Sequence, residues 1–514
     1  MPVLPPKAHR EELSDFAESS FLKILQRDPQ VEQRIRSSEL PMELLRDLYR
    51  KFGGTPRFLL QIREAIKEMD TEMLKKELAK VELPTDAEAG ELQKIRDKYF
   101  DDIFTERLYG YLSPESQIAL SRSAVYGVPV TLEGLAAAAG VAPDVVAVFA
   151  KDWEDRTFAY RDTEKSLWSI YGLLRWWLMA KISSEERMTA HKAAGDFLNE
   201  IHLQKREGEQ DLNWLDCLME ARAQYLQAKE YGQARKINDI ISIRFERYGI
   251  YEEVVQLNQE MLGYEEHPLP MNRIAMVYEC RGHLREAREW YQRSLDASAD
   301  KTAEAGMAWN GLAGIDYQQG NYKDAQDKYQ KSLAIASLIG NKQGEATVLH
   351  NLAMIDLILS KQDEALKKFQ TSLELGQEIG DRRNEAAILH GLAIIDLRLS
   401  KYDLAIEKFQ TSLKINQEIG DREGEAATFY QLGLLAKSQG RAHDGVRLIA
   451  LCYLIYAYIG HGEAQNAFKS VSSMASELNY TKEQLDAALK DLEESYGEDQ
   501  GKGLLEAAFG KGGI

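Results

Sequence analysis

The sequence is short of proline, cysteine and metal-binding histidine motifs, and each shortage excludes a class of structure. Only 12 of the 514 residues are proline, and none follows Pro270. Because proline interrupts helices, the second half of the chain can form helices without breaks. The three cysteines, Cys217, Cys280 and Cys452, form no CxxC pair, and the histidines form no HxxxH or HExxH spacing. We therefore expect buried thiols in a reducing compartment and no metal site.

Long hydrophobic runs are also missing. The longest, at 448–459, has 12 residues and is too short to cross a bilayer. The amino terminus has no apolar stretch behind its basic residues and does not resemble a signal peptide. The chain has 64 basic and 82 acidic residues, and its net charge of −18 repels nucleic-acid phosphates. We expect a cytoplasmic protein with no membrane or nucleic-acid partner.

The motifs of common enzyme classes are absent as well. There is no GxxxxGK[ST] phosphate loop and no GxSxG nucleophile elbow. Ser332, Ser372 and Ser412 stand at equivalent positions of a repeat, but they lie in predicted helices with no obvious base beside them. We expect no catalytic residue, no cofactor and no enzymatic activity.

What the chain does have is an internal repeat. Segments 343–382 and 383–422 are identical at 26 of 40 positions. Weaker copies of the same unit are found at 266–302, 303–342 and 423–462. Within a unit, apolar residues recur every three or four positions, and a polar break near Gly320 or Ser360 divides the unit into two helices. Such hairpins bury their apolar faces only by stacking, which predicts an α-solenoid.

These units resemble the tetratricopeptide repeat (TPR), in the long-helix variety of kinesin light chains. The family's leucine–small pair, later alanine and aromatic residue correspond to Leu352, Ala353, Ala365 and Phe369. The usual proline at the end of the unit is missing, and Ile-Gly-Asp-Arg replaces it. The resemblance implies an array that binds other proteins.

The resemblance also implies a groove lined by the first helix of each unit, where the family often carries an asparagine that grips a peptide backbone. The polar or aromatic residues at that position are Asn272, Asn310, His350, His390 and Tyr430, and the apolar residues around them are Met276, Tyr317, Met354, Leu357 and Leu397. We interpret the ten residues as a partner-binding groove for an extended or helical peptide. The alternative is that His350 and His390 are solvated copies inherited with the repeat.

The first 205 residues have a different character. Helices are predicted at 44–52, 58–69, 114–126, 131–139, 143–152, 175–182 and 184–202. A β-hairpin is predicted from Thr157 to Tyr171, with its turn at Arg161–Thr163. Three helices and a β-ribbon within this short stretch are the parts of a winged helix. Its second helix, TLEGLAAAA, has no Lys or Arg, which disfavours DNA binding.

The order of these parts resembles the carboxy-terminal half of STAND signalling ATPases, which have a helical lid, a winged helix and a repeat sensor. In that family a glycine–x–proline turn of the lid touches the adenine of the nucleotide. Gly53, Gly54 and Pro56 match this turn, but only as a vestige, because the phosphate loop is missing. The winged-helix histidine that many members carry is also missing, at 171–175.

We therefore predict an all-α protein with a TPR-type solenoid in its carboxy-terminal half. The expected parts are a lid-like region at 1–92, a winged-helix-like domain with connecting helices at 93–206, divergent repeats at 207–265, the TPR array at 266–465, and capping helices with a frayed tail at 466–514. One capping helix is expected from Thr481 to Glu494.

The leading functional hypothesis is a non-catalytic interaction scaffold. It would act as the sensor or adaptor arm of a bacterial signalling or defence system and bind a partner protein or peptide in the groove. The alternative is the regulatory part of a STAND ATPase whose nucleotide-binding core lies upstream of this chain. A third reading, a winged-helix DNA-binding regulator, is less favoured.

Overall fold

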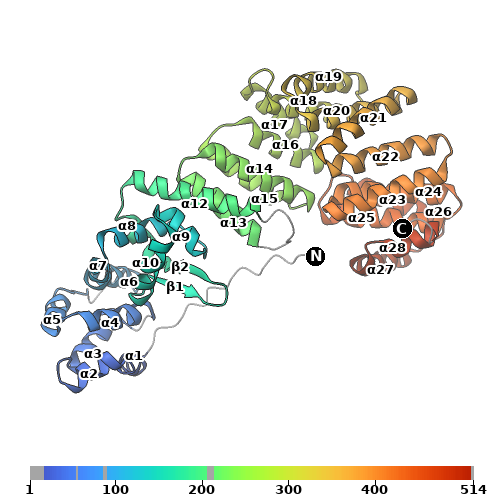
Figure 1. The fold of residues 1–514 in the computed structure, drawn as a ribbon. Coiled ribbons are helices and arrows are strands. Elements are labelled where there is room, and N and C mark those ends of the chain that lie inside the picture. The colour runs from blue at the N-terminus through green and yellow to red at the C-terminus, as the bar shows by residue number, and fades with distance from the viewer. Residues whose placement is uncertain (1–16, 54–55, 85–88, 205–212, 511–514) are drawn as a thin grey trace. The chain divides into compact units, whose positions relative to one another are not determined.

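The computed structural model describes residues 17–53, 56–84, 89–204 and 213–510, and it confirms the helical fold (Figure 1). Within these residues the strands are confined to one β-hairpin and every other regular element is a helix. The chain divides into two compact units between Ala234 and Arg235. This division falls inside a helix of the segment 207–265, which the sequence analysis had assigned as a whole to divergent repeats.

The amino-terminal unit is built from short helices around one continuous core. Its elements are α1 (Glu18–Gln26), α2 (Pro29–Arg36), α3 (Met42–Phe52), α4 (Pro56–Glu68), α5 (Thr71–Ala79), α6 (Ala89–Phe100), the π-helix η1 (Asp101–Thr105), α7 (Glu106–Gly110), α8 (Pro114–Ser123), α9 (Leu132–Ala139), α10 (Pro143–Asp155), β1 (Ala159–Asp162), β2 (Leu167–Ile170), α11 (Gly172–Met179), α12 (Ser184–Gln204) and α13 (Asn213–Gln227). Stacked and edge-on phenylalanine rings from α3, α4, α6 and η1 form the centre of its first part.

The lid-like turn is only partly described. Gly53 ends α3 with a φ of 82°, which an L-residue with a side chain rarely adopts, and Pro56 begins α4. Gly54 lies outside the described residues.

The three helices and the hairpin expected between 114 and 171 are present. The strands β1 and β2 pair antiparallel, and Val130 adds a bridge to Trp168 on β2. The turn, however, lies later than predicted, because Arg161 and Asp162 still belong to β1. The carboxylate of Asp162 accepts hydrogen bonds from the two backbone N–H groups of 164 and 165 and so fixes the turn after the strand.

The helix α9 is covered rather than presented to solvent. It packs against α8, α10 and α12, and most of its residues are buried. A side chain at Gly134 would lie 2.7 Å from the ring of Phe197 on α12. By length and composition no single described helix could cross a bilayer, although α9 and α10, bent by 101°, pass that test as a pair.

The second unit contains the repeats. Its helices are α14 (Tyr231–Arg247, which begins in the first unit), α15 (Tyr251–Tyr264), α16 (Pro268–Cys280), α17 (Leu284–Ala297), α18 (Ala303–Gln318), α19 (Tyr322–Ile339), α20 (Lys342–Ile358), α21 (Gln362–Ile379), α22 (Arg382–Arg398), α23 (Tyr402–Ile419), α24 (Arg422–Ser438), α25 (Ala442–Tyr458), α26 (Ala464–Glu477), α27 (Lys482–Asp499) and α28 (Lys502–Phe509). The predicted hairpins α18–α19, α20–α21, α22–α23 and α24–α25 are confirmed.

The Ile-Gly-Asp-Arg segment works as a double cap between repeats. Gly380 ends α21 in the left-handed conformation, with a φ of 69°. The carboxylate of Asp381 then accepts a hydrogen bond from the backbone N–H of Asn384 and begins α22. A glycine C-cap followed by an acidic N-cap turns the chain without the proline that the family usually has.

Small residues let the helices approach one another, as the sequence predicted. Ala353, Ala365 and Phe369 are fully buried within one repeat interface. Gly391 on α22 faces Phe369 so closely that an added Cβ would lie 2.5 Å from the ring. The interfaces from α16 to α22 therefore form separate apolar clusters, as expected for a stacked array.

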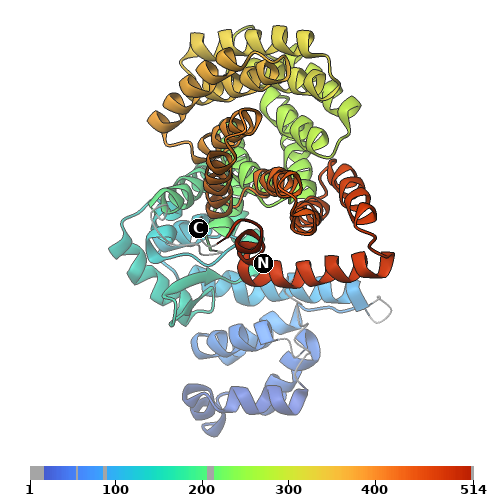
Figure 2. The ribbon, with the colours of Figure 1, turned by 90° about the vertical axis from the view of Figure 1, so that its right-hand side faces the viewer.

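The array curls until its last turn meets its first (Figure 2). The backbone N–H of Gly462, after α25, donates to the carbonyl of Cys280 at the end of α16, at 2.8 Å. Gly249 packs directly on Ile459. Side chains of α15 and α16 share one apolar cluster with those of α23, α24 and α25. The superhelix is therefore closed by direct contact and is not an open arc.

Three helices follow the last repeat and pack on α25. The helix expected from Thr481 is confirmed as α27, with Thr481 and Gln484 forming a capping box, but it runs to Asp499. The hydroxyl of Tyr496 donates to Glu425 on α24 at 2.7 Å. These helices cover the end of the array, and the residues 511–514 of the expected tail lie outside the described part.

Candidate functional site

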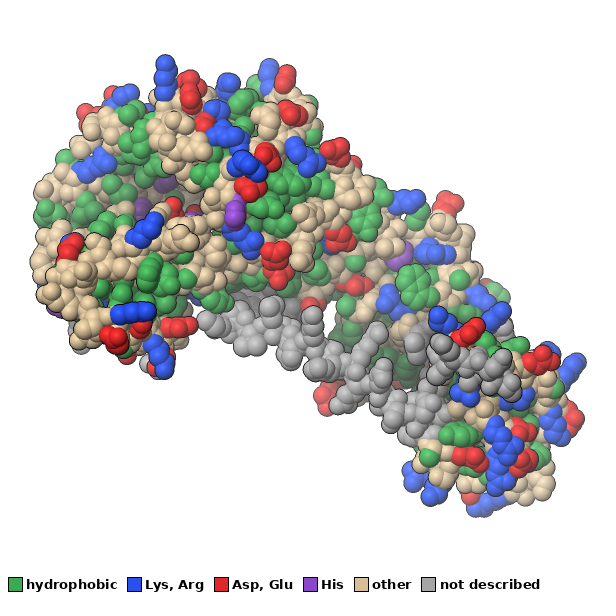
Figure 3. Space-filling view, turned by 180° about the vertical axis from the view of Figure 1, so that it is seen from behind, with side chains coloured by type: hydrophobic (Ala, Val, Ile, Leu, Met, Phe, Trp, Pro, Cys, Tyr) green, Lys and Arg blue, Asp and Glu red, His purple; other side chains and the backbone are tan. Residues whose placement is uncertain are grey.

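The first helices of the repeats, α16, α18, α20, α22 and α24, form the inner side of the curve. Successive helices of this set contact one another. Such contacts are expected on the concave side of a curved array, where neighbouring repeats are closest together. We call this surface the inner face. Figure 3 shows the array hollowed on one side, with histidine side chains in the recess.

The polar or aromatic positions of the predicted groove, which we call the ladder, are Asn272, Asn310, His350, His390 and Tyr430. Its two histidines lie half-buried at equivalent positions of successive repeats. The ring of His350 packs on Phe369 at 5.5 Å between centroids, and that of His390 packs on Phe409 at 5.1 Å. Nδ1 of His390 lies 3.3 Å from the hydroxyl of Thr428 in the next repeat. Burial lowers the pKa of both rings to about 4, so both are neutral near pH 7.

The other polar positions of the ladder connect neighbouring repeats. The Asn351 amide donates to Oδ1 of Asn310 at 3.1 Å, and the Tyr430 hydroxyl lies 3.2 Å from that of Ser470. Asn272 differs, because its side chain is fully buried and its amide donates to the carbonyl of Glu304. Asn272 therefore anchors α18 and does not present its side chain on the inner face.

The apolar positions divide in the same way. Leu357 is 1% exposed and belongs to the cluster between α20 and its neighbours. The remaining predicted residues are partly buried at the edges of these clusters, namely Met276, Tyr317, Met354 and Leu397. The structure thus leaves four apolar side chains and four polar or aromatic ones partly accessible.

One unpaired polar atom marks the centre of the ladder. Nδ1 of His350 is buried and has no hydrogen-bond partner among the described residues. The counterpart of His350 in the next repeat, His390, has Nδ1 beside the hydroxyl of Thr428. The residue that corresponds to Thr428 for His350 is Ile388, which is apolar and buried in the core. A buried polar nitrogen without a partner carries a free-energy cost that a bound donor or acceptor would remove.

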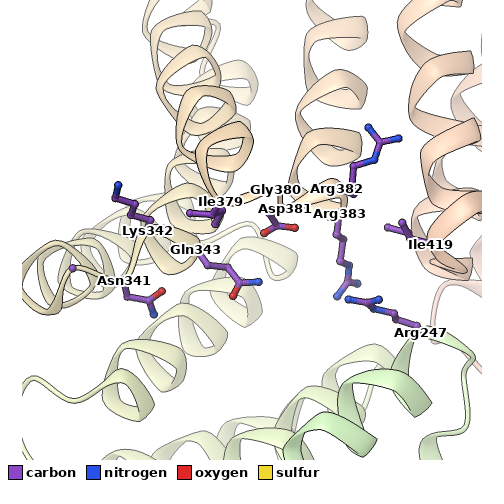
Figure 4. Close-up of a pocket in the computed structure, with 11 residues that line it drawn as sticks. Arg247, Asn341, Lys342, Gln343, Ile379, Gly380, Asp381, Arg382, Arg383 and Ile419 are labelled. Atoms are coloured by element: carbon purple, nitrogen blue, oxygen red, sulfur yellow. The ribbon is translucent and has the colours of Figure 1, made fainter. Parts of the chain in front are cut away.

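A cavity of about 660 Å³ opens where the turns between repeats meet α14 (Figure 4). Its lining includes Asn341, Lys342, Asp381, Arg382, Arg383 and Arg247. The cations from the repeats are paired, Arg383 with Asp421 at 2.6 Å and Arg382 with Glu418 at 3.0 Å. Nε of Arg247 is buried without a partner in the described chain, and its guanidinium points toward that of Arg383. Sequence reasoning missed this cavity, although the recurring Gly-Asp-Arg turn marks its position.

The repeated serines are structural. The hydroxyls of Ser332, Ser372 and Ser412 are buried and donate to backbone carbonyls of the preceding helix, at 2.6 to 2.8 Å. They connect the two helices of each hairpin, and this geometry gives them no role as nucleophiles.

Among the described residues one group combines three metal-ligand types, formed by Cys280, Glu423 and His461. No metal site was expected from the sequence, because the cysteines form no CxxC pair and the histidines form no HxxxH or HExxH spacing. Only the closure of the superhelix brings these three residues together.

The repeats match a family model. Residues 304–378 and 384–444 match one model of the tetratricopeptide repeat, and residues 271–298 match a second. The chain therefore contains tetratricopeptide repeats, as the sequence predicted. Among curated proteins, none matches the sequence.

The chain is also similar to solved structures. It resembles a Signal Transduction ATPase with Numerous Domains (STAND) protein with a tetratricopeptide repeat sensor from Pyrococcus horikoshii, at a TM-score of 0.62 and 15% identity, over 97% of this chain and 68% of the other. A Rap protein complexed with competence and sporulation factor is 14% identical, over 59% of this chain and 96% of the other, at a TM-score of 0.35. The first likeness shows a shared fold, and the second is too distant to carry an argument.

Proposed function

We propose that this chain, as a protein built on tetratricopeptide repeats, is a non-catalytic scaffold that binds a partner protein through a peptide segment on its inner face. The observation that carries the proposal is the row of partly accessible side chains on successive first helices: Asn310, His350, His390 and Tyr430, with Met276, Tyr317, Met354 and Leu397 beside them. Such a row offers hydrogen-bonding groups at the repeat spacing, with apolar surface between them.

The chemistry of the row favours a neutral or acidic segment over a basic one. Near pH 7 both histidines are uncharged, so the row offers neutral hydrogen-bonding rings and no cation of its own. In the nearby cavity, Arg247, whose Nε is buried without a hydrogen-bond partner among the described residues, favours a carboxylate. A partner peptide with an acidic residue near one end would contact both the neutral row and Arg247.

The proposed biological role is a sensor or adaptor arm in bacterial signalling or defence. The likeness in fold to a STAND protein with a repeat sensor supports this role over 97% of the chain. The same likeness supports the alternative proposal that the chain is the regulatory part of an ATPase whose nucleotide-binding core is encoded upstream. A strand–GxxxxGK[ST]–helix pattern in the reading frame ahead of Met1 supports the alternative, and its absence there favours the separate arm.

The winged-helix-like part gives little support to DNA binding. Its second helix, α9, is largely buried under α12 and has no basic residue to offer a groove. We therefore propose that the winged-helix-like part packs against protein and does not bind DNA.

The binding proposal is tested in two stages. Pulldown from a lysate with mass spectrometry supplies candidate partners, and calorimetric titration then measures their affinity for the purified full chain. The variant His350→Ala/His390→Ala is expected to bind at least about tenfold more weakly, as loss of central contacts commonly does. The matched control is His443→Ala, a histidine outside the row that contacts Tyr480. If the double variant keeps its helical content and binds with the same affinity as the unmodified chain, the two histidines do not contribute to partner binding.

A further inference from the structure

Three side chains of different ligand type meet where the superhelix closes. Cys280 is the last residue of α16, Glu423 lies in the first turn of α24, and His461 follows α25. The sulfur, a carboxylate oxygen and a ring nitrogen all lie within 4.8 Å of one another. Nε2 of His461 is 3.8 Å from Oε1 of Glu423. Small side-chain movements would therefore bring all three atoms to bonding distance from one ion.

The backbone holds these residues in place. The hydrogen bond from Gly462 N–H to the Cys280 carbonyl links the two segments next to the ligands themselves. Gly462 also packs on Gly282 so closely that a Cβ would lie 2.8 Å from the Gly282 Cα atom. The ring of His461 stacks on Tyr456 at 4.5 Å between centroids. Two of the three ligands are thus positioned by contacts that do not depend on an ion.

The surroundings are rich in negative charge. Burial, and then the nearby carboxylates of Glu423, Glu279 and Glu246, raise the pKa of the Cys280 thiol well above the ordinary value. Two cations oppose these carboxylates: Nη2 of Arg383 lies 3.6 Å from Glu423, and Nη1 of Arg273 lies 3.2 Å from Glu246. A divalent cation bound at this point would favour the thiolate form of Cys280, since a coordinated thiol loses its proton.

Binding of a metal ion would alter the hydrogen bonds and the protonation of Cys280 and His461. The Tyr251 hydroxyl is hydrogen-bonded to Cys280, and the Glu463 backbone N–H donates to Nδ1 of His461 at 3.1 Å. In the neutral ring the proton is then on Nε2, toward Glu423. Coordination through Nε2 moves this proton to Nδ1 and releases the partly exposed Glu463 N–H to water. The thiol proton leaves to solvent as the metal–sulfur bond forms.

We propose that Cys280, Glu423 and His461 bind a zinc ion that links the first and last turns of the repeat superhelix. Zinc accepts thiolate, imidazole and carboxylate ligands together, whereas calcium and magnesium require oxygen alone. Three protein ligands leave a fourth position for water or for the Tyr251 phenol. This proposal is independent of partner binding on the inner face.

The test uses the full chain after removal of metal ions. Cobalt(II), added alone, is expected to bind with one equivalent and to give a sulfur-to-metal charge-transfer band that zinc abolishes. Cys280→Ser is expected to lose the band, and Glu423→Gln and His461→Gln are expected to weaken zinc binding at least about tenfold. The matched controls are Cys217→Ser and His443→Gln, which should bind as the unmodified chain does.

A second measurement needs no variant. At a pH high enough for the zinc-free thiol to react measurably, zinc bound at this site should slow the alkylation of Cys280 by iodoacetamide at least about tenfold, as followed by mass spectrometry, and leave that of Cys217 unchanged. It should also raise the midpoint of thermal unfolding, because the ion binds the closed fold alone. An unchanged alkylation rate at saturating zinc, or a cobalt band that persists in Cys280→Ser, would overturn the proposal.

Discussion

Asp396 on α22 accepts a charge-assisted hydrogen bond from Lys408 on α23, with 2.5 Å between Oδ2 and Nζ. The two preceding repeats hold the same pair, as Asp356 with Lys368 and Asp316 with Lys328. In each case the carboxylate is nearly buried and the lysine is partly exposed. The pair connects the two helices of one hairpin at the same height in each of these three copies.

Removal of one lysine should therefore cost more than an ordinary surface change. Lys408→Met leaves the Asp396 carboxylate buried without its counter-ion, and we expect the free energy of unfolding to fall by about 2 kcal/mol. Chemical denaturation followed by circular dichroism measures the change. The control is Arg285→Met, whose pair with Glu289 is exposed (side chains 84% and 67%) and should contribute almost nothing. Equal effects of the two substitutions would show that burial of the aspartate is unimportant.

Gly391 offers a test of helix packing. A methyl group there would lie 2.5 Å from the Phe369 ring, so Gly391→Ala forces the two helices apart and should lower the unfolding free energy by about 1–3 kcal/mol. Gly263→Ala, in an open position of α15, is the comparison and should be neutral or slightly stabilising. Thermal unfolding compares the two variants, and a neutral Gly391→Ala would contradict the close contact.

The buried serines should contribute to stability. Ser412→Ala removes the hydrogen bond to the Ala386 carbonyl, 2.8 Å long, and should cost about 1 kcal/mol. Its neighbour Thr411 is exposed, and its hydroxyl donates to the Glu407 carbonyl in the same helix, so Thr411→Ala should change little. Both variants are compared by denaturant midpoint. A Ser412→Ala variant as stable as Thr411→Ala would argue against this linking role.

The two ladder histidines should make stability depend on pH. Burial holds their folded pKa near 4, below the value of about 6.5 in an unfolded chain. As the pH falls through 6.5 the unfolded chain takes up protons that the folded chain does not, so this contribution is complete above pH 6.5 and is lost toward pH 4. The double variant His350→Leu/His390→Leu should lose less stability over that range. Parallel unfolding midpoints for both proteins across these pH values would refute the assignment.

The repeats could be predicted from the sequence because their contacts are local and periodic. Ala365 and Phe369 belong to the same hairpin, and the identical spacing in the next copy shows which face they share. The capping role of Gly380 is equally visible, since glycine before an acidic residue is typical of a helix end followed by a helix start.

Accessibility on the inner face could not be predicted in the same way. Asn272 and Leu357 share the periodicity of their neighbours, yet both are buried, because the next helix covers them. Periodicity identifies the face of a helix but not how far the adjacent repeat extends over it. The hairpin turn was wrong for a similar reason: Asp162 caps the turn from inside the strand, whereas its residue type alone is typical of the turn itself.

The contact between Gly282 and Gly462 has a consequence for the history of the gene. In an open solenoid, duplication or loss of one unit changes only the length of the molecule. Here the two glycines meet after one fixed number of turns, and an additional 40-residue unit would carry the last turn past the first. Copy number, which varies freely among open arrays, is therefore constrained in this one, and each repeat is indispensable to the closure of the whole.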